Sequence, residues 1–461
     1  MPYCRQCATD HDRQEGLMIT AYLKVIRDSF WFRPALYNLV AVLLAIAAVL
    51  LDLRLSEETR ILGVASMSLE RTTELVATLA GAILTMTTIT FSAILIVLTT
   101  YSSQFSPRVL QNFVANRATQ HVLALFSSGF TYCVLVLLLV SEREAYKLLA
   151  TPGVAIVWSL AGIAAFIFLL THTTSWLQVN NLIGFIAAET EATMRHMLGR
   201  KVNDRRCPVE AEDSRWCQAG LEISACKSGY VVMVGLEGLL KKAEQDGVIV
   251  RTEVAVGAFV AEGMPLMSLI GIGSHKPDYE AYRELIQLDI EPRPWEDIGF
   301  GLRKMAEIAL RAISPSINDP YTAATAVQYL GSILIKLAAR SPQNPGLANQ
   351  HGTLRVLIRE PDFEEYLLRA FQELRRYGSE DITTLAAILE ALGWIARLSG
   401  HQWHDLLWGF GADTYRLAEE SNDWLPSEER RLTVPLRRLA ATTGRQTDVQ
   451  TLLEKKGALE R

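Results

Sequence analysis

The chain has 461 residues, of which 50% are hydrophobic and 21% charged, and its 45 basic and 50 acidic side chains give a formal net charge of −5. This composition excludes global disorder and collagen-like repetition, and the length allows roughly three folding units of about 150 residues. The acidic balance argues against a protein that follows a nucleic-acid backbone, which requires surplus positive charge. Six cysteines spread over this length do not form a disulfide scaffold.

Residues 1–17 differ in composition from the rest of the chain. Cys4, Cys7 and His11 suggest half of a zinc site, but no second Cys pair at metal-ligand spacing completes it. The first apolar run begins too late for a cleavable signal and lacks a small-residue cleavage site. We interpret residues 1–17 as a disordered extension, or as residues upstream of a start at Met18.

Four apolar stretches are long enough to cross a hydrocarbon core of about 30 Å, which takes about 20 helical residues. None carries Lys, Arg, Asp or Glu near its centre, so buried helices of a soluble protein are a poor explanation. The predicted spans are residues 35–53, 75–100, 121–140 and 153–177, within a transmembrane domain of residues 18–184.

Basic residues concentrate before the first span, between spans two and three, and after the fourth span. The middle group is Arg108 and Arg117, with no Asp or Glu between Gln104 and Gln120, whereas the other two connections are mixed or acidic. Because basic residues remain on the cytoplasmic side of a membrane, both termini are predicted to be cytoplasmic.

The second span carries a stripe of small and hydroxyl-bearing residues along one helical face. The stripe consists of Thr78, Gly81, Thr85, Thr88, Ser92 and Thr99. Small residues let membrane helices approach closely, so the stripe can be a packing seam. Alternatively, several subunits can turn it toward a water-filled path, where hydroxyl groups partly replace the hydration shell of an ion. The absence of charge within the spans argues against a proton-coupled transporter.

Two polar residues are expected near the inner ends of the spans. Arg108 follows Pro107 after span two and is expected at the lipid surface, as a headgroup anchor or as a gate or subunit contact. His172 lies near the end of span four, where it is expected to be a solvated interfacial side chain or a pH sensor.

Residues 185–290 are predicted to form a small cytoplasmic β-rich domain. Short β-branched runs alternate with glycines between residues 219 and 272, which is typical of four to six short strands joined by turns. The glycine spacing is reminiscent of barrel-sandwich modules such as lipoyl domains, but no lysine occupies a hairpin tip, which disfavours a cofactor carrier. The expected strands are residues 230–234, 248–250, 253–256, 259–260 and 266–270.

Residues 291–461 are predicted to form a cytoplasmic α-helical domain, with polar linkers at 274–296 and 341–350. Asp319 is expected to cap a helix that begins at Pro320 and runs to about residue 340, and a catalytic role for Asp319 is the weaker interpretation. The acidic group in the first linker suggests a divalent-cation site or a solvated acidic surface. That group consists of Asp289, Glu291, Glu296 and Asp297.

No sequence motif for common enzyme chemistry is present. The chain lacks a phosphate-binding loop, a nucleophile elbow, a metalloprotease pair and a dinucleotide fingerprint. The sequence therefore predicts no catalytic residue, cofactor or metal ligand. A membrane enzyme would require a polar pocket around Asp289, Asp297 or Asp319.

The segments after the first two spans combine into a recognisable order. They are QFSPR at 104–108, SGYV at 228–231, GAFVAEGMPL at 257–266 and DIGFGLRKMAEIALRAISPSINDPYTA at 297–323. This order resembles the DUF2254 family of predicted bacterial membrane proteins of unknown function, over roughly residues 18–430. Ser316 and Val256 depart from the glycine and proline common in the family at these positions, which affects local turn geometry. The resemblance implies a multi-pass protein of the bacterial inner membrane and supplies no reaction.

The resulting prediction is a membrane α-helical protein with four spans, followed by a cytoplasmic α+β region in which a small glycine-punctuated β-domain precedes an α-helical domain. One hypothesis is a homo-oligomer in which span two faces the symmetry axis and forms a channel-like path. The alternative is a membrane-anchored scaffold or signalling protein without a conducting pore. Expected partners are the lipid bilayer and further copies of the chain, without nucleic acid.

Overall fold

The computed structural model divides the chain into two compact units, which meet in sequence at residues 178 and 179, with Gln104–Ser106 assigned to the second unit. Arg108, Cys4, Cys7 and His11 lie outside the described residues, as does the side chain of His172. The described residues are 32–58, 67–104, 117–140, 147–176, 178–198, 205–209, 214–273, 277–291, 297–339 and 345–459.

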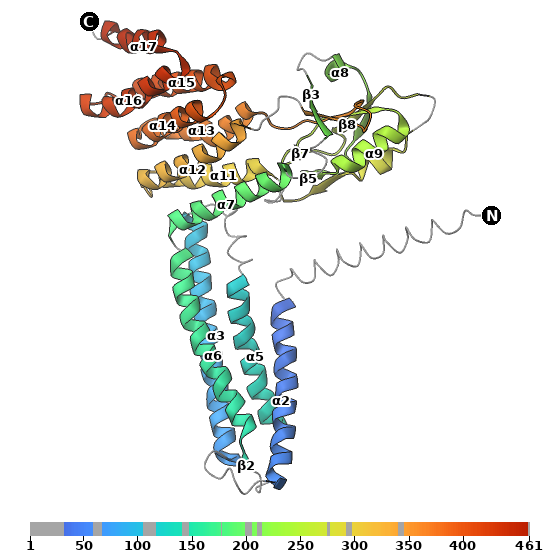
Figure 1. The fold of residues 1–461 in the computed structure, drawn as a ribbon. Coiled ribbons are helices and arrows are strands. Elements are labelled where there is room, and N and C mark those ends of the chain that lie inside the picture. The colour runs from blue at the N-terminus through green and yellow to red at the C-terminus, as the bar shows by residue number, and fades with distance from the viewer. Residues whose placement is uncertain are drawn as a thin grey trace, which may run out of the picture. The chain divides into compact units, whose positions relative to one another are not determined.

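The first unit contains four helices that are long and apolar enough to cross a membrane, which confirms the four predicted spans. Most of each helix surface is exposed and carries large apolar side chains, as lipid contact requires. Two short strands, β1 (Met67–Ser68) and β2 (Lys147–Leu148), pair antiparallel beside the helix ends. The helices, labelled in Figure 1, are α2 (Phe32–Glu58), α3 (Leu69–Gln104), α5 (Arg117–Leu139) and α6 (Ala150–Trp176).

Helix α2 packs against α5 through a seam of small residues. Ala41, Ala45 and Ala48 are buried and lie on one face of α2, because they are spaced by three and four residues. Small side chains let two membrane helices approach closely. Near one end of this seam, Asn38 donates a hydrogen bond to Ser127 (3.0 Å) and accepts one from Thr131 (2.6 Å). The close packing inside this unit therefore uses α2, a helix that the sequence did not single out.

Asp52 of α2 binds the first turn of α6. Its side chain is only 1% exposed, and its two carboxylate oxygens accept hydrogen bonds from three backbone N–H groups at 2.8 to 3.0 Å. The donors belong to Leu149, Ala150 and Thr151. The first N–H groups of a helix have no partner within the helix, and a negative charge there also interacts favourably with the helix dipole. Asp52 thus caps a helix that begins about a hundred residues later in the chain.

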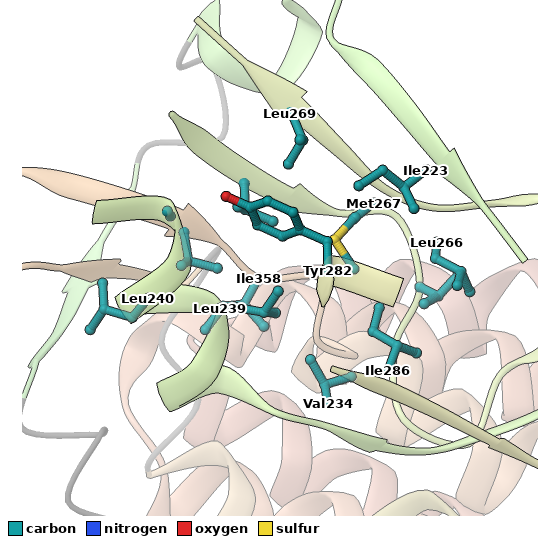
Figure 2. Packing of buried hydrophobic residues seen from close by; sticks show 14 of the residues in the cluster. Ile223, Val234, Leu239, Leu240, Leu266, Met267, Leu269, Tyr282, Ile286 and Ile358 are labelled. Atoms are coloured by element: carbon teal, nitrogen blue, oxygen red, sulfur yellow. The ribbon is translucent and has the colours of Figure 1, made fainter. Parts of the chain in front are cut away.

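The second unit begins with α7 (Val179–Leu198) and contains two sheets. The larger has the order β3-β10-β11-β6-β8-β4 and the smaller the order β7-β5-β9. Figure 2 shows part of the buried cluster, in which Tyr282 and Met267 lie close to Leu239 and Ile286. The elements are β3 (Arg206–Pro208), α8 (Ser214–Cys217), β4 (Leu221–Ser224), β5 (Gly229–Val234), α9 (Leu236–Asp246), β6 (Ile249–Thr252), β7 (Phe259–Val260), β8 (Pro265–Ile270), α10 (Tyr279–Arg283), β9 (Ile286–Asp289), β10 (Pro345–Ala348) and β11 (Leu354–Leu357).

Both predicted linkers contain regular structure. The first holds α10 and β9, and the second contains β10, with β11 directly after it, so residues 291–461 are not entirely helical. Strand β11 pairs parallel with β6, with Val356 opposite Val250, and this long-range pairing leaves no local sequence signal. Residues 253–256, which were expected to form a strand, lie outside regular structure.

The rest of the second unit is a stack of helical hairpins. The pairs α11–α12, α13–α14 and α15–α16 follow one another, with contacts along the row α12, α14, α16 (Figure 1). Such repeated stacking of helix pairs is the architecture of an α-solenoid. The helices are α11 (Ile298–Ala312), α12 (Pro320–Ala338), α13 (Phe363–Tyr377), α14 (Ile382–Leu398), α15 (His404–Ser421), α16 (Pro426–Thr443) and α17 (Gln446–Leu459), with the short 3-10 helix η2 (His401–Trp403) before α15.

Replacing Asp52 by Ala should lower the thermal stability of the helical bundle, because three backbone N–H groups of the α6 segment lose their acceptor. We expect a loss of about 3 kcal/mol or more, measured as a fall in the midpoint of thermal unfolding of the purified protein in detergent. The control is Glu70→Ala, which removes an exposed carboxylate from the first turn of α3. Equal shifts for the two variants would contradict the capping role of Asp52.

Candidate functional site

The stripe on α3 is exposed along its full length. Each of its six residues is solvent-accessible in the first unit: Thr78, Gly81, Thr85, Thr88, Ser92 and Thr99. Four threonine hydroxyl groups donate to backbone carbonyl groups of α3 itself, at distances of 2.8 to 3.0 Å. A hydroxyl that donates within its own helix can face an apolar surrounding without losing a hydrogen bond, and its oxygen can still accept one.

Helix α3 contacts the other spans through a different face. Val76, Ala80 and Ile83 are buried, and Met86 packs against the same cluster. The stripe therefore takes no part in packing within the described first unit. None of the described residues of the first unit covers it.

Asp319 stands directly before α12, whose first residue is Pro320. One carboxylate oxygen of Asp319 accepts the backbone N–H of Thr322 at 3.1 Å, and the other accepts the Thr322 hydroxyl at 2.6 Å. Both oxygens are therefore engaged in holding the first turn of the helix. This geometry leaves Asp319 poorly placed for catalysis.

The described acidic residues of the first predicted linker are not gathered into a cation site. Among the described residues, no group of three or more His, Cys, Asp or Glu side chains is arranged to hold a metal ion. Asp289 accepts the N–H of Ile290 at 2.8 Å, whereas Asp297 is buried and only 7% exposed. Glu296 lies outside the described residues.

Asp297 connects the sheet-forming part of the second unit, which we call the β-part, to the helical hairpins that follow it. It stands before the first turn of α11, and its carboxylate lies against Gly257 in the turn between β6 and β7. Burial raises the pKa of the Asp297 carboxyl, and the nearby guanidinium groups of Arg369 and Arg303 oppose that rise. The two segments that the sequence singled out, residues 257–266 and 297–323, therefore meet at this carboxylate.

Glycines make this junction possible. Gly257 has a φ of +86°, and a Cβ there would overlap the Oδ2 atom of Asp297. A Cβ at Gly299 would overlap the guanidinium group of Arg369, and one at Gly301 would overlap the Thr190 hydroxyl of α7. The close spacing of glycines at the start of α11 thus allows both α13 and α7 to approach it.

A buried lysine lies between α11 and α7. Lys304 has 1% of its side chain exposed, with its ammonium group 4.0 Å from Glu189 of α7 and 4.7 Å from the centre of the Phe300 ring. Burial lowers the pKa of Lys304, and Glu189 and Glu307 oppose this shift. Two residues further along α7, Glu191 pairs with Lys336 of α12. Two ion pairs and the contact at Gly301 therefore fix α7 to the first hairpin of the stack.

Sequence reasoning missed the roles of Asp297 and Lys304. Asp297 was grouped with other carboxylates as a cation ligand or surface charge, and Lys304 was not considered. The available signal was the motif that contains both, in which glycines alternate with apolar residues at the start of a helix. Such spacing indicates close backbone approach, but only the fold identifies the groups that approach.

Replacing Gly257 by Ala should destabilise the second unit more than the same change at Gly263. Both glycines have a φ of +86°, but a Cβ at Gly263 meets nothing within 4 Å. The backbone cost is therefore shared, at about 1 kcal/mol, and the overlap with Asp297 should add about 1 to 3 kcal/mol. The measurement is the midpoint of thermal unfolding in detergent. In a protein that already carries Asp297→Ala, the overlap is absent, so adding Gly257→Ala should lower the midpoint only as much as Gly263→Ala does. If Gly257→Ala lowers the midpoint equally with and without Asp297, the two effects are additive and the overlap is contradicted.

The chain is similar to uncharacterized mycobacterial proteins and matches one family model. It is 31% identical over 324 residues to uncharacterized protein Rv1290c of Mycobacterium tuberculosis and, at the same identity, to uncharacterized protein Mb1321c of Mycobacterium bovis. The aligned region covers 67% of this chain and 60% of each relative, so the chain spans about 60% of the length of these relatives. No solved structure matches it. The model of the DUF2254 family, described as predicted membrane protein, matches residues 27–393, and the chain belongs to this family.

Proposed function

We propose that the protein is a homo-oligomer in the membrane, in which the α3 stripes of several copies face a common axis and form a channel-like path. The observation that carries this proposal is the exposure of all six stripe residues on a span whose other face is packed. The four spans of one chain enclose too little space for an aqueous path, so conduction requires several copies. The second unit would then act as an assembly or regulatory collar.

The hydrogen bonding of the stripe supports a path lined by hydroxyl groups. Thr85 and Thr88 donate to carbonyl groups of their own helix, so each hydroxyl oxygen keeps acceptor capacity for a cation or a water molecule. The packing between α2 and α5 already has its own seam of Ala41, Ala45 and Ala48. A second small-residue surface on α3 is therefore available for contacts between copies.

The orientation proposed with this function places both termini and the second unit in the cytoplasm of a bacterial cell, at the inner membrane. Its support is the distribution of basic residues: the connection between spans two and three contains Arg108 and Arg117 but no Asp or Glu, and basic residues favour the cytoplasmic side.

A labelling experiment tests the orientation. In a variant that keeps Cys226 as its only cysteine, this exposed thiol should react with a membrane-impermeant maleimide only after spheroplasts are permeabilised. A single cysteine placed at Glu144, in the connection between the third and fourth spans, should react in intact spheroplasts. The reverse pattern would place the second unit outside the cytoplasm.

Replacing Thr85 and Ser92 by Leu should abolish conductance of the reconstituted protein in planar bilayers, because the larger apolar side chains would narrow and dry the path. The oligomer should persist in detergent, because larger apolar side chains do not weaken packing between helices. The control is Thr171→Leu on α6, an exposed threonine that also donates to its own helix. It should conduct like the unmodified protein.

A monomeric particle in detergent and in nanodiscs, together with no ion flux at any voltage or pH, would remove the proposal of a channel. Loss of conductance in the Thr171→Leu control as well would show a general effect of membrane-facing leucines.

The second candidate is a membrane-anchored scaffold or signalling protein without a conducting path. The observation that favours it is the stack of helical hairpins from α11 to α16, because α-solenoids present extended surfaces to protein partners. In that case, replacing Thr85 and Ser92 by Leu would leave the binding of protein partners unchanged.

A further inference from the structure

The outer surface of α14 and α16 combines exposed apolar side chains with arginines. We call this surface the α14–α16 face. It consists of Trp394 and Leu398 on α14 and Arg430, Arg431, Val434, Arg437 and Arg438 on α16. Arg431 donates to the Thr383 hydroxyl at the start of α14 (3.2 Å), so the two helices present neighbouring parts of one surface.

The four arginines concentrate positive charge on a chain whose formal net charge is −5. They follow the spacing i, i+1, i+7 and i+8, which places them on both sides of Val434 on the exposed side of α16. Arg430 donates to the carbonyl oxygen of Pro426 at 3.2 Å. Arg437 lies close to the phenol of Tyr415, as do the carboxylates of Glu419 and Glu429.

The α14–α16 face also carries three exposed apolar side chains. Trp394 is 41% exposed, Leu398 61% and Val434 44%. The opposite side of α14 already supplies the core of the stack through residues such as Leu389 and Leu392. The exposed side of α14 therefore carries Trp394 and Leu398 beside two charged residues, Glu390 and Arg397.

We infer that the α14–α16 face binds an acidic segment of another protein, one that carries apolar side chains between its carboxylates. Guanidinium groups pair with carboxylates through two parallel hydrogen bonds, and Trp and Arg are enriched among the residues that dominate protein interfaces. Charge complementarity thus selects an acidic partner, and Trp394, Leu398 and Val434 supply the apolar contact. This inference does not depend on whether α3 forms a path.

Glu390 favours a protein segment over an anionic membrane surface. This exposed carboxylate lies one turn before Trp394 on the same side of α14. A peptide can place a neutral or basic residue opposite Glu390, whereas a bilayer of anionic headgroups presents negative charge everywhere and would be repelled there.

The test uses the full chain in nanodiscs of phosphatidylcholine, a lipid without net charge. The probe is a fluorescein-labelled peptide of Glu-Glu-Leu repeats, and its fluorescence anisotropy reports binding. We expect saturable binding that Arg431→Glu/Arg438→Glu weakens by about tenfold or more. Arg359→Glu/Arg376→Glu is the control, because it makes the same change in charge at exposed arginines outside the face and should leave the affinity within about twofold.

Further variants separate the possible outcomes. Arg431→Gln/Arg438→Gln, with an unchanged midpoint of thermal unfolding, should also weaken binding, which excludes misfolding as the cause. A Glu-Glu-Ser peptide should bind several-fold more weakly than the Glu-Glu-Leu peptide if the apolar contact is real. No saturable binding, equal weakening in the control, or equal affinity for the two peptides would overturn the inference. So would displacement of the peptide by phosphatidylglycerol vesicles but not by phosphatidylcholine vesicles, because that result would identify a lipid surface as the occupant.

Discussion

The bilayer provides no water to replace a lost hydrogen bond, and this constraint governs how polar groups are arranged in the first unit. Asp52 is buried near the end of α2, where it accepts three backbone N–H groups that α6 cannot satisfy itself. Asn38 is bonded on both sides by Ser127 and Thr131. Asp52 and Asn38 thus hold neighbouring spans together at defined positions along their length.

The stripe on α3 obeys the same constraint in a different way. Its threonines donate to their own helix, so the helix can present them outward without a further partner. The energetic cost of exposing these residues is therefore small, whether lipid, water or another copy lies against them. Isolated hydroxyl groups can also face lipid at little cost. The six stripe residues differ from these because they lie along one face of the helix, and the proposed function depends on that alignment.

In the second unit, buried charge and glycine act together. Asp297 stands directly before α11 and lies against the turn at Gly257, whereas Lys304 lies within α11 and faces α7. Each is buried next to opposite charges, so neither can leave its position without exposing or unpairing another group. The glycines at 257 and 301 provide the space for these approaches. One helix thereby fixes three parts of the unit, and the stack of hairpins continues from it.

Much of the architecture was predictable because it follows from local patterns. The spans are long, uncharged and apolar, so their number follows from the thickness of a membrane. The helix that begins at Pro320 was marked by its capping residue, and the turns of the β-part by glycines. Strands β10 and β11 were missed, because their pairing with β3 and β6 joins residues about a hundred or more positions apart.

The sequence by itself determined that the chain crosses a membrane four times and continues into a mixed α/β region, since hydrophobic length and periodicity are properties of contiguous residues. The tertiary structure decided which polar groups form contacts between distant segments. It showed that α2 carries a buried seam of small residues, that Asp297 is buried at a junction, and that Asp52 caps a distant helix. These outcomes depend on which segments meet in space, and burial and hydrogen bonding between distant residues leave no periodic trace in a single sequence.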